Sequence, residues 1–237
     1  MNLFKNVDKS WIPLLHSLAH KEPLVDFLQN LNQISYQPAF EEIFKVFEMP
    51  VKDIKLVILG QEPNPRPGAA IGTAFAVSEQ SKPTAVLSSI RKELLDTNQF
   101  HVVGRYWKTL THWTEQGVFL LNTSLTVETG VAGSHRRYWK DFTEMVISFI
   151  SHENPCVWML WGRESLSYSS RITNPLIVKG YDRDSIEDIP VDPKINYIIP
   201  GHHPVVMLMK GTKEFSGDGF YFTNKILTKK SLKQITW

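Results

Sequence analysis

The sequence predicts an α/β fold in which a central four-stranded parallel sheet is flanked by helices. Four short apolar runs, which begin at Ile54, Gly117, Pro155 and Asn196, each end in a cluster of polar residues. Runs of this kind are typical of buried parallel strands, which are apolar on both faces. Stretches with helical spacing alternate with these runs, and this alternation indicates an α/β architecture.

Helices are expected where apolar residues recur at helical spacing. These stretches are Leu24–Leu31, Ala39–Phe47, Val86–Leu95, Trp139–Ile150 and Phe222–Leu232. The segment 171–194 contains three prolines and is predicted to be an insertion or a long loop before the last strand. Because no repeat, low-complexity stretch or linker divides the chain, residues 1–237 are predicted to form a single domain.

The polar residues that follow the four runs are predicted to form one site. In an open parallel sheet, ligands bind outside the carboxyl ends of the strands. This rule brings together Gln61, Glu62, Asn64, Asn122, Gly162 and His203. Polar groups that converge from several strands are what a functional site requires.

Composition excludes several classes of protein. With 237 residues, of which 42% are apolar, the chain can bury a full core and is expected to be monomeric. No segment is typical of a membrane span or a secretory signal, so we expect a cytoplasmic protein, or a nuclear one in a eukaryotic host. The single Cys156 excludes disulfides, a cysteine zinc site and an iron–sulfur cluster. No metal or other cofactor is expected.

The net charge of +2 hides a gradient along the chain. Residues 201–237 carry six lysines against two acids, whereas residues 1–50 carry four lysines against six acids. A second basic excess comes from Arg136, Arg137 and Lys140. Basic residues beside a site at the strand ends favour a phosphate-rich partner, although a solvated lysine face would give the same pattern.

An ordered set of motifs along nearly the whole chain resembles that of the family 1 uracil-DNA glycosylases. GQEPNPRPGAAIGTAFAV at 60–77 is similar to the family's water-activating GQDPYH motif and the glycine-rich stretch that ends in a phenylalanine. Further matches are Leu120–Asn122, Thr126–Val127, Ser134–His135, Trp139, Phe142–Thr143, Leu160–Gly162, His203–Pro204, Phe220, Thr223–Asn224 and Trp237. Each match is weak alone, but their common order argues against chance.

The resemblance implies a DNA repair enzyme that flips a nucleotide and hydrolyses the N-glycosidic bond of uracil or of a related damaged base. It assigns water activation to Glu62. His203 would be the electrophile that donates a hydrogen bond to the uracil oxygen as the departing base becomes anionic. The neighbouring His202 is interpreted as structural, and metal binding by the histidine pair is disfavoured.

Base recognition is assigned by the same resemblance. The Asn122 amide, which has both a donor and an acceptor, would read the N3–H and O4 edge of uracil, and Phe75 would stack on the ring. Gln61 and Asn64 complete the predicted base-binding set. Without the resemblance, Asn122 would be interpreted as a turn former and Phe75 as a core residue.

Three residues of the first motif depart from the family pattern. Glu62 replaces an aspartate and moves the carboxylate by roughly 1 Å, and displacements of that size can lower a rate about 10²-fold. Asn64 replaces the tyrosine that packs against uracil C5, and Pro65 replaces a histidine. The altered wall is expected to weaken the exclusion of a thymine methyl group. Reduced or altered activity is therefore predicted.

The predicted DNA-binding residues are Lys82, Pro83, Ser134, His135, Gly162, Arg163, Val205, Met207, Lys210 and Lys213. Met207 occupies the position of the apolar wedge that fills the gap left by a flipped nucleotide. Val205 stands where the family has a serine and lacks its polar group. For Arg163, a phosphate contact, a pair with Glu164 and a solvated side chain remain open.

A second class of function remains open as well. The chain would then be a non-catalytic protein that binds a lesion or an abasic site, or a scaffold for repair or replication proteins. A nucleotide-binding α/β protein is less well supported, because no GxGxxG or Walker motif follows any of the runs.

Overall fold

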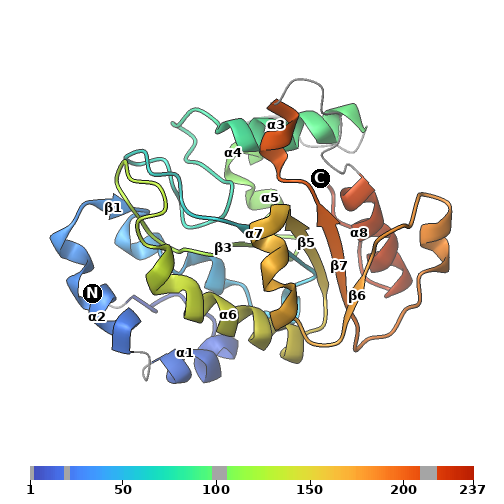
Figure 1. The fold of residues 1–237 in the computed structure, drawn as a ribbon, viewed down its shortest axis with the longest axis horizontal. Coiled ribbons are helices and arrows are strands. Elements are labelled where there is room, and N and C mark those ends of the chain that lie inside the picture. Colours follow the sequence, from blue (N-terminus) through green and yellow to red (C-terminus); the bar gives the residue numbers. More distant parts are fainter. Residues whose placement is uncertain (1–2, 19–21, 98–105, 209–217) are drawn as a thin grey trace.

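A five-stranded parallel sheet forms the centre of the computed structural model, which describes residues 3–18, 22–97, 106–208 and 218–237. The strand order is β3-β2-β5-β7-β6, and every neighbouring pair is parallel. A separate antiparallel pair joins β1 (Tyr36–Gln37) to β4 (Val127–Glu128). Figure 1 shows helices on both faces of the central sheet, so the predicted α/β class is confirmed.

The four predicted strands are confirmed. They are β2 (Leu56–Gly60), β3 (Val118–Asn122), β5 (Val157–Trp161) and β7 (Asn196–Gly201). The expectation of only four strands was wrong, because β6 (Pro175–Ile177) pairs with β7 inside the segment predicted to be a loop. The strand is short and partly exposed, and its Pro175 is tolerated because β6 lies at the edge of the sheet.

Four of the five predicted helices are present. The structure has α1 (Ile12–Leu18), α2 (Glu22–Asn30), α3 (Ala85–Asp96), α4 (Tyr106–Thr109), α5 (Thr111–Thr114), α6 (Arg136–Glu153), α7 (Gly162–Ser167) and α8 (Asp218–Lys229). None of the helices in the described ranges combines the length and apolar character that crossing a bilayer demands.

The helix predicted over 39–47 was wrong. Two short 3-10 turns, Phe40–Glu42 and Lys45–Glu48, occupy this stretch. Ile43 and Phe44 are both buried, as are Val46 and Phe47 after them. A helix on the surface of a sheet buries one stripe only, whereas the broken backbone turns all four side chains inward.

The two faces of the sheet bury separate apolar layers because side chains alternate along each strand. Leu56 and Ile58 of β2 pack with α3, α5 and α8, whereas Val57 and Leu59 pack with α1, α2 and α6. Full burial of one large apolar side chain contributes roughly 1.5–3 kcal/mol. Both layers hold the sheet rigid and fix the positions of the loops at its carboxyl edge.

Candidate active site

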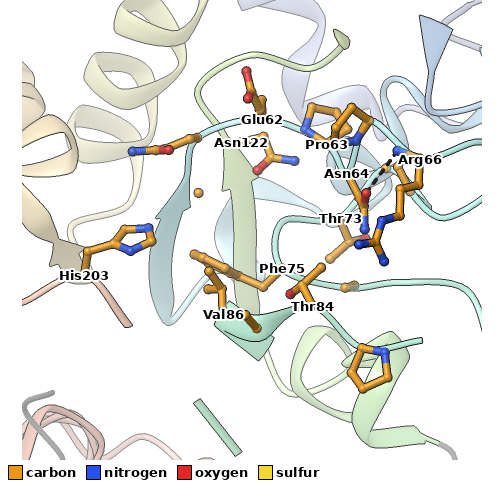
Figure 2. Close-up of a pocket in the computed structure, with 18 residues that line it drawn as sticks. Glu62, Pro63, Asn64, Arg66, Thr73, Phe75, Thr84, Val86, Asn122 and His203 are labelled. Atoms are coloured by element: carbon orange, nitrogen blue, oxygen red, sulfur yellow. Dashed lines mark hydrogen bonds between the residues drawn. The ribbon is translucent and has the colours of Figure 1, made fainter. Parts of the chain in front are cut away.

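The loops at the carboxyl ends of the strands surround a cavity of about 440 Å³ (Figure 2). All six residues that the sequence analysis assigned to catalysis or base binding line it. They are Gln61, Glu62, Asn64, Phe75, Asn122 and His203, together with Pro83 from the predicted DNA-binding set. These residues follow different strands, so the fold brings them together as expected for an open parallel sheet.

Asn122 presents an unpaired amide to this cavity. It ends β3 opposite Gly60 of β2, and only 6% of its surface is exposed. A Cβ atom at Gly60 would lie 2.5 Å from Asn122 Oδ1, so the strand needs glycine there. No hydrogen bond joins the amide to any of the residues that the structure describes. Neither amide atom is among the fully buried side-chain atoms without a partner in the described ranges, so the amide is open to the cavity and suited to the polar edge of a ligand.

Phe75 forms one wall of the cavity from an unusual backbone position. Its φ angle is 67°, in the left-handed region that residues other than glycine rarely adopt. The amide of the preceding Ala74 donates to Leu120 O of β3 at 3.0 Å. The ring packs against Trp161, with 5.5 Å between the ring centroids. These contacts hold the aromatic face as a fixed surface for stacking.

His203 follows β7, and its ring points toward Phe75 and Asn122 in Figure 2. The Val205 amide donates to its Nδ1 at 3.2 Å, so the neutral ring carries its proton on Nε2. Burial lowers the pKa of His203 below its ordinary value of 6.5, although Glu164 opposes the shift. The ring is therefore neutral near pH 7 and offers an N–H donor to the cavity.

Gly162 allows His203 to approach the end of β5. It is the first residue of α7, and its φ angle of 83° falls in the region that favours glycine. A Cβ atom there would lie 3.1 Å from His203 Cβ. Gly162, which the sequence assigned to DNA binding, thus also sets the position of the histidine.

The Glu62 carboxylate is held away from the space above Phe75. Its Oε2 accepts a hydrogen bond from the Gly133 amide at 2.7 Å and lies 3.2 Å from Arg136 Nε. Figure 2 shows the carboxylate pointing away from Phe75 and His203. The Glu62 side chain is 12% exposed and that of Arg136 is 42% exposed, so solvent screens part of the attraction between them.

Gln61 and Glu164 extend this network. Gln61 Nε2 donates to Glu164 Oε2 at 2.8 Å, and Arg136 Nη1 lies 3.6 Å from the same oxygen. Arg136 therefore joins the loop after β2 to the start of α7. The predicted base-binding residue Gln61 lines the cavity, but its amide nitrogen is directed to Glu164.

Asn64 uses its side chain to shape its own loop. Its Oδ1 accepts a hydrogen bond from the Arg66 amide at 3.0 Å, which is a local turn of the kind asparagine favours. Gly130 N donates to Pro65 O at 2.9 Å and fastens the loop to the chain beyond β4. The amide of Asn64 is thus turned toward the loop rather than across the cavity.

Several predicted DNA-binding residues lie on the surface around the cavity. Lys82, Arg163 and Val205 are exposed, and Ser134 Oγ accepts a hydrogen bond from Glu128 N at 2.8 Å. Glu164 pairs with Arg136, not with Arg163. Arg163 makes no ion pair within the described ranges, so its guanidinium remains available to an external anion.

The assignment of His135 to the DNA surface needs correction. Its side chain is 3% exposed, and its ring packs edge-on against Phe27 at 4.9 Å. His135 Nδ1 lies 2.9 Å from Thr126 Oγ1, which also accepts the indole N–H of Trp139. Burial lowers the pKa of His135, and this effect outweighs the attraction of Glu128 and Glu62. His135 anchors the loop before α6 from within.

The side chains of three other predicted DNA-binding residues lie outside the described part of the structure. The backbone of Met207 belongs to the short 3-10 turn Pro204–Leu208, whose side chains at 207 and 208 lie outside the described part. Lys210 and Lys213 fall in 209–217, which also lies outside it. In the described ranges, no three His, Cys, Asp or Glu residues are arranged to hold a metal ion.

Sequence reasoning missed two arginines of the site. Arg66 lines the cavity, although nothing in its motif distinguished it from a solvated loop residue. Arg136 was noted for its charge alone, and its contact with Glu62 joins positions 74 residues apart. A pair that distant in sequence can be found only when the fold is known.

Comparisons with known proteins agree with the motif order. The chain is 33% identical to the uracil-DNA glycosylase of Geobacillus kaustophilus, over 100% of this chain and 96% of that protein. It is 34% identical to uracil-DNA glycosylase 1 of Listeria monocytogenes serovar 1/2a, over 73% of this chain and 81% of the relative. No family model matches the sequence.

Solved structures support the same fold. The crystal structure of mimivirus uracil-DNA glycosylase aligns with a TM-score of 0.81 at 22% identity and covers 100% of this chain and 89% of that one. The enzyme from Nitratifractor salsuginis aligns with a TM-score of 0.59 at 16% identity, over 95% and 94% of the two chains. With identity above 30% to a curated relative along its whole length, this chain belongs to the uracil-DNA glycosylase family.

Proposed function

We propose that this protein removes uracil, or a closely related damaged base, from DNA by hydrolysing the N-glycosidic bond. The observation that carries this proposal is the unpaired Asn122 amide, which faces a cavity walled by Phe75 and reached by the ring of His203. A base inside a duplex cannot reach such a cavity, so the nucleotide must be flipped out first.

The side chains of the cavity suit both the polar edge and the face of a uracil ring. One amide side chain can accept a hydrogen bond from N3–H and donate one to O4, which are adjacent on the uracil ring. Stacking on Phe75 would position the plane of the base, since every base has a π-face. O2 lies on the side of N3 opposite O4. When Asn122 binds N3–H and O4, O2 therefore faces His203.

Departure of the base leaves negative charge on O2 and positive charge on the sugar. The neutral His203 ring, with its proton on Nε2, is suited to donate to O2 as that charge grows. Loss of one fixed donor of this kind lowers other enzymes' rates by about 10²–10³-fold. We therefore assign to His203 the role of stabilising the negative charge on the departing base.

Glu62 is the one acidic residue that lines the cavity, so it is the candidate to activate the water that attacks the sugar. Its bonds to Arg136 and Gly133 draw it away from that position in this structure. We propose that these contacts, together with the extra methylene of glutamate, make uracil excision slower than an aspartate at position 62 would.

DNA is the proposed partner of the surface around the cavity. Arg163 and Lys82 are exposed beside it and have no acidic partner in the described ranges, so they are suited to phosphate contacts. The logarithm of the binding constant should fall as the logarithm of the salt concentration rises. Each phosphate that the protein neutralises should add about −0.9 to this slope.

One observation favours a second candidate function. If the Glu62 carboxylate remained bound to Arg136 with DNA present, no side chain would activate water, and the protein would bind lesions or abasic sites without hydrolysis. Abasic sites lack the stacking of one base and are flipped at a lower cost, by a few kcal/mol.

A panel of duplex oligonucleotides separates these two functions. Each duplex carries uracil, thymine, hypoxanthine or an abasic site, and release of free base is measured separately from retention of DNA. Release of uracil over several turnovers supports the glycosylase. Tight retention of the abasic duplex with no base released from any member of the panel would favour the second function.

A further inference from the structure

The cavity continues beyond the space that uracil itself would fill. It reaches from His203 past Phe75 to Thr84 and to the exposed Arg66, and all four residues line the same open cavity. Cavities of about 300–1,000 Å³ hold ligands of drug size, and this one of about 440 Å³ lies within that range. A single pyrimidine ring would leave one end of it empty.

The geometry of the pyrimidine ring identifies which atom faces the empty end. C2 and C5 lie opposite each other across the ring. When O2 points to His203 and the N3–O4 edge meets Asn122, C5 points away from His203. Figure 2 shows His203 on one side of Phe75 and Arg66 with Thr73 on the other. A substituent on C5 would therefore extend toward Arg66.

Two features keep this end of the cavity open. Asn64 is bonded back to the Arg66 amide, so it does not extend across the cavity in the way a larger side chain would. Several of the residues that line the cavity are also small, among them Ala70, Gly72 and Ala76. The opening is thus fixed by a turn and by residue size, not by a chance rotamer.

The open end is cationic and rich in donors. The guanidinium of Arg66 makes no ion pair in the described ranges. Thr84 Oγ1 accepts the Leu87 amide at the start of α3 and so keeps its own hydrogen available to donate. Glu62 is the one acid among the residues lining the cavity, and it is bonded to Arg136.

We propose that the site recognises a uracil ring that carries an anionic substituent on C5, with the guanidinium of Arg66 as the partner of that anion. A guanidinium binds a carboxylate through two parallel hydrogen bonds, and such charge-assisted bonds are among the stronger ones in proteins. This inference rests on the proposed function, because it assumes that the flipped base lies in this cavity.

Binding to a duplex that cannot be cleaved tests the inference separately from catalysis. A 2′-fluorinated nucleotide resists hydrolysis because fluorine destabilises the cationic sugar. Affinities are measured for duplexes in which it carries uracil, thymine, 5-hydroxymethyluracil or 5-carboxyuracil. We expect 5-carboxyuracil to bind at least about tenfold more tightly than uracil, the scale of one charge-assisted hydrogen bond, and 5-hydroxymethyluracil to gain less.

Three variants locate the source of that preference. Arg66→Ala should reduce the ratio of the 5-carboxyuracil affinity to the uracil affinity to about one. Arg66→Lys should keep part of the preference, because lysine keeps the positive charge but cannot make the two parallel hydrogen bonds of a guanidinium. Asn64→Tyr should remove the preference by filling the open end. Arg163→Ala is the matched control, since this exposed arginine lies outside the cavity lining and should leave the ratio unchanged.

Equal affinities for uracil and 5-carboxyuracil overturn the inference, even if the protein releases uracil rapidly from a cleavable duplex. An Arg66→Ala variant that weakens every duplex equally and flattens the salt dependence overturns it too, because Arg66 would then be a phosphate contact. A 5-carboxyuracil preference that Arg66→Ala removes supports it, and a lack of turnover on cleavable uracil would then count against hydrolysis alone.

Discussion

At the scale of single residues, neighbours decide what each side chain of the cavity can do. His203 and His202 are adjacent in sequence, but only the ring of His203 lines the cavity and accepts a backbone N–H on Nδ1. His202 is exposed. Backbone contacts, rather than residue type, thus distinguish the proposed electrophile from its neighbour.

Replacement of His203 or Asn122 by alanine should reduce uracil excision by at least about 10²-fold, the scale of losing one preorganised group. Binding to undamaged duplex should change little, because both side chains face the flipped base. Single-turnover rates and duplex titrations measure the two effects. His202→Ala is the control, and a loss equal to that of His203→Ala would show that the electrophile is assigned to the wrong histidine.

The combined variant Glu62→Asp with Asn64→Tyr should raise the rate of uracil excision. Aspartate is one methylene shorter than Glu62 and is expected to hold Arg136 less closely, and the tyrosine would close the open wall beside C5. The changes must be tested together, because neighbouring residues of one site are not additive. A steady-state rate on uracil duplex that stays the same would mean that neither position limits the reaction.

The sequence identified the side chains of this site better than their orientations. The convergence of Asn122 and His203 was predictable because they lie at the ends of buried strands, which the fold places at one edge, whereas their roles came from the resemblance to the glycosylase family. The direction of Glu62 and the position of Arg66 depend on loop turns and on a contact with Arg136 in a distant helix. Local patterns carry no signal for such contacts.

At the scale of secondary-structure elements, the strands were predictable because they are buried on both faces and therefore uniformly apolar. β6 escaped prediction because an edge strand with an exposed Pro175 and Ile177 has no such run. The stretch 39–47 was misassigned because two 3-10 turns bury more of its side chains than one helical face would. Packing against the sheet overrode the helical spacing.

Two glycines with similar backbones provide a test at the junction of β5 and α7. Gly162 and Gly180 have φ angles of 83° and 81°, but only a Cβ atom at Gly162 would meet another residue, His203 at 3.1 Å. Gly162→Ala should therefore lower both stability and excision rate, whereas Gly180→Ala should lower stability alone, by about 1 kcal/mol. Thermal melts and single-turnover rates of both variants decide whether the close approach to His203 matters.

At the scale of the whole molecule, stability should depend on pH through the buried His135 and the half-buried His203. Burial lowers the pKa values of His135 and His203 below 6.5, so the folded chain binds fewer protons than the unfolded chain as the pH falls through that value. Stability linked to these groups is complete above about pH 6.5 and is lost as the pH drops toward their folded pKa values.

The free energy of unfolding should accordingly fall as the pH is lowered from 7.5 to 5.5, about one unit on either side of the ordinary histidine pKa. His135→Gln should flatten this dependence, since glutamine does not titrate and its amide can either donate a hydrogen bond to Thr126 or accept one from it. Urea titrations at several pH values measure it. His202→Gln, which changes an exposed ring, should keep the full slope, and an equally flat profile for that variant would refute the assignment to His135.

Phe75 sets stability and activity against each other. Its left-handed backbone costs roughly 1–2 kcal/mol relative to a glycine, so Phe75→Gly would relax the chain locally while it removes the proposed stacking surface. The aromatic ring recovers part of that cost through its contact with Trp161. Selection of variants for thermal stability alone would therefore tend to replace this aromatic residue. The selected proteins would fold but would lack the surface on which a base stacks.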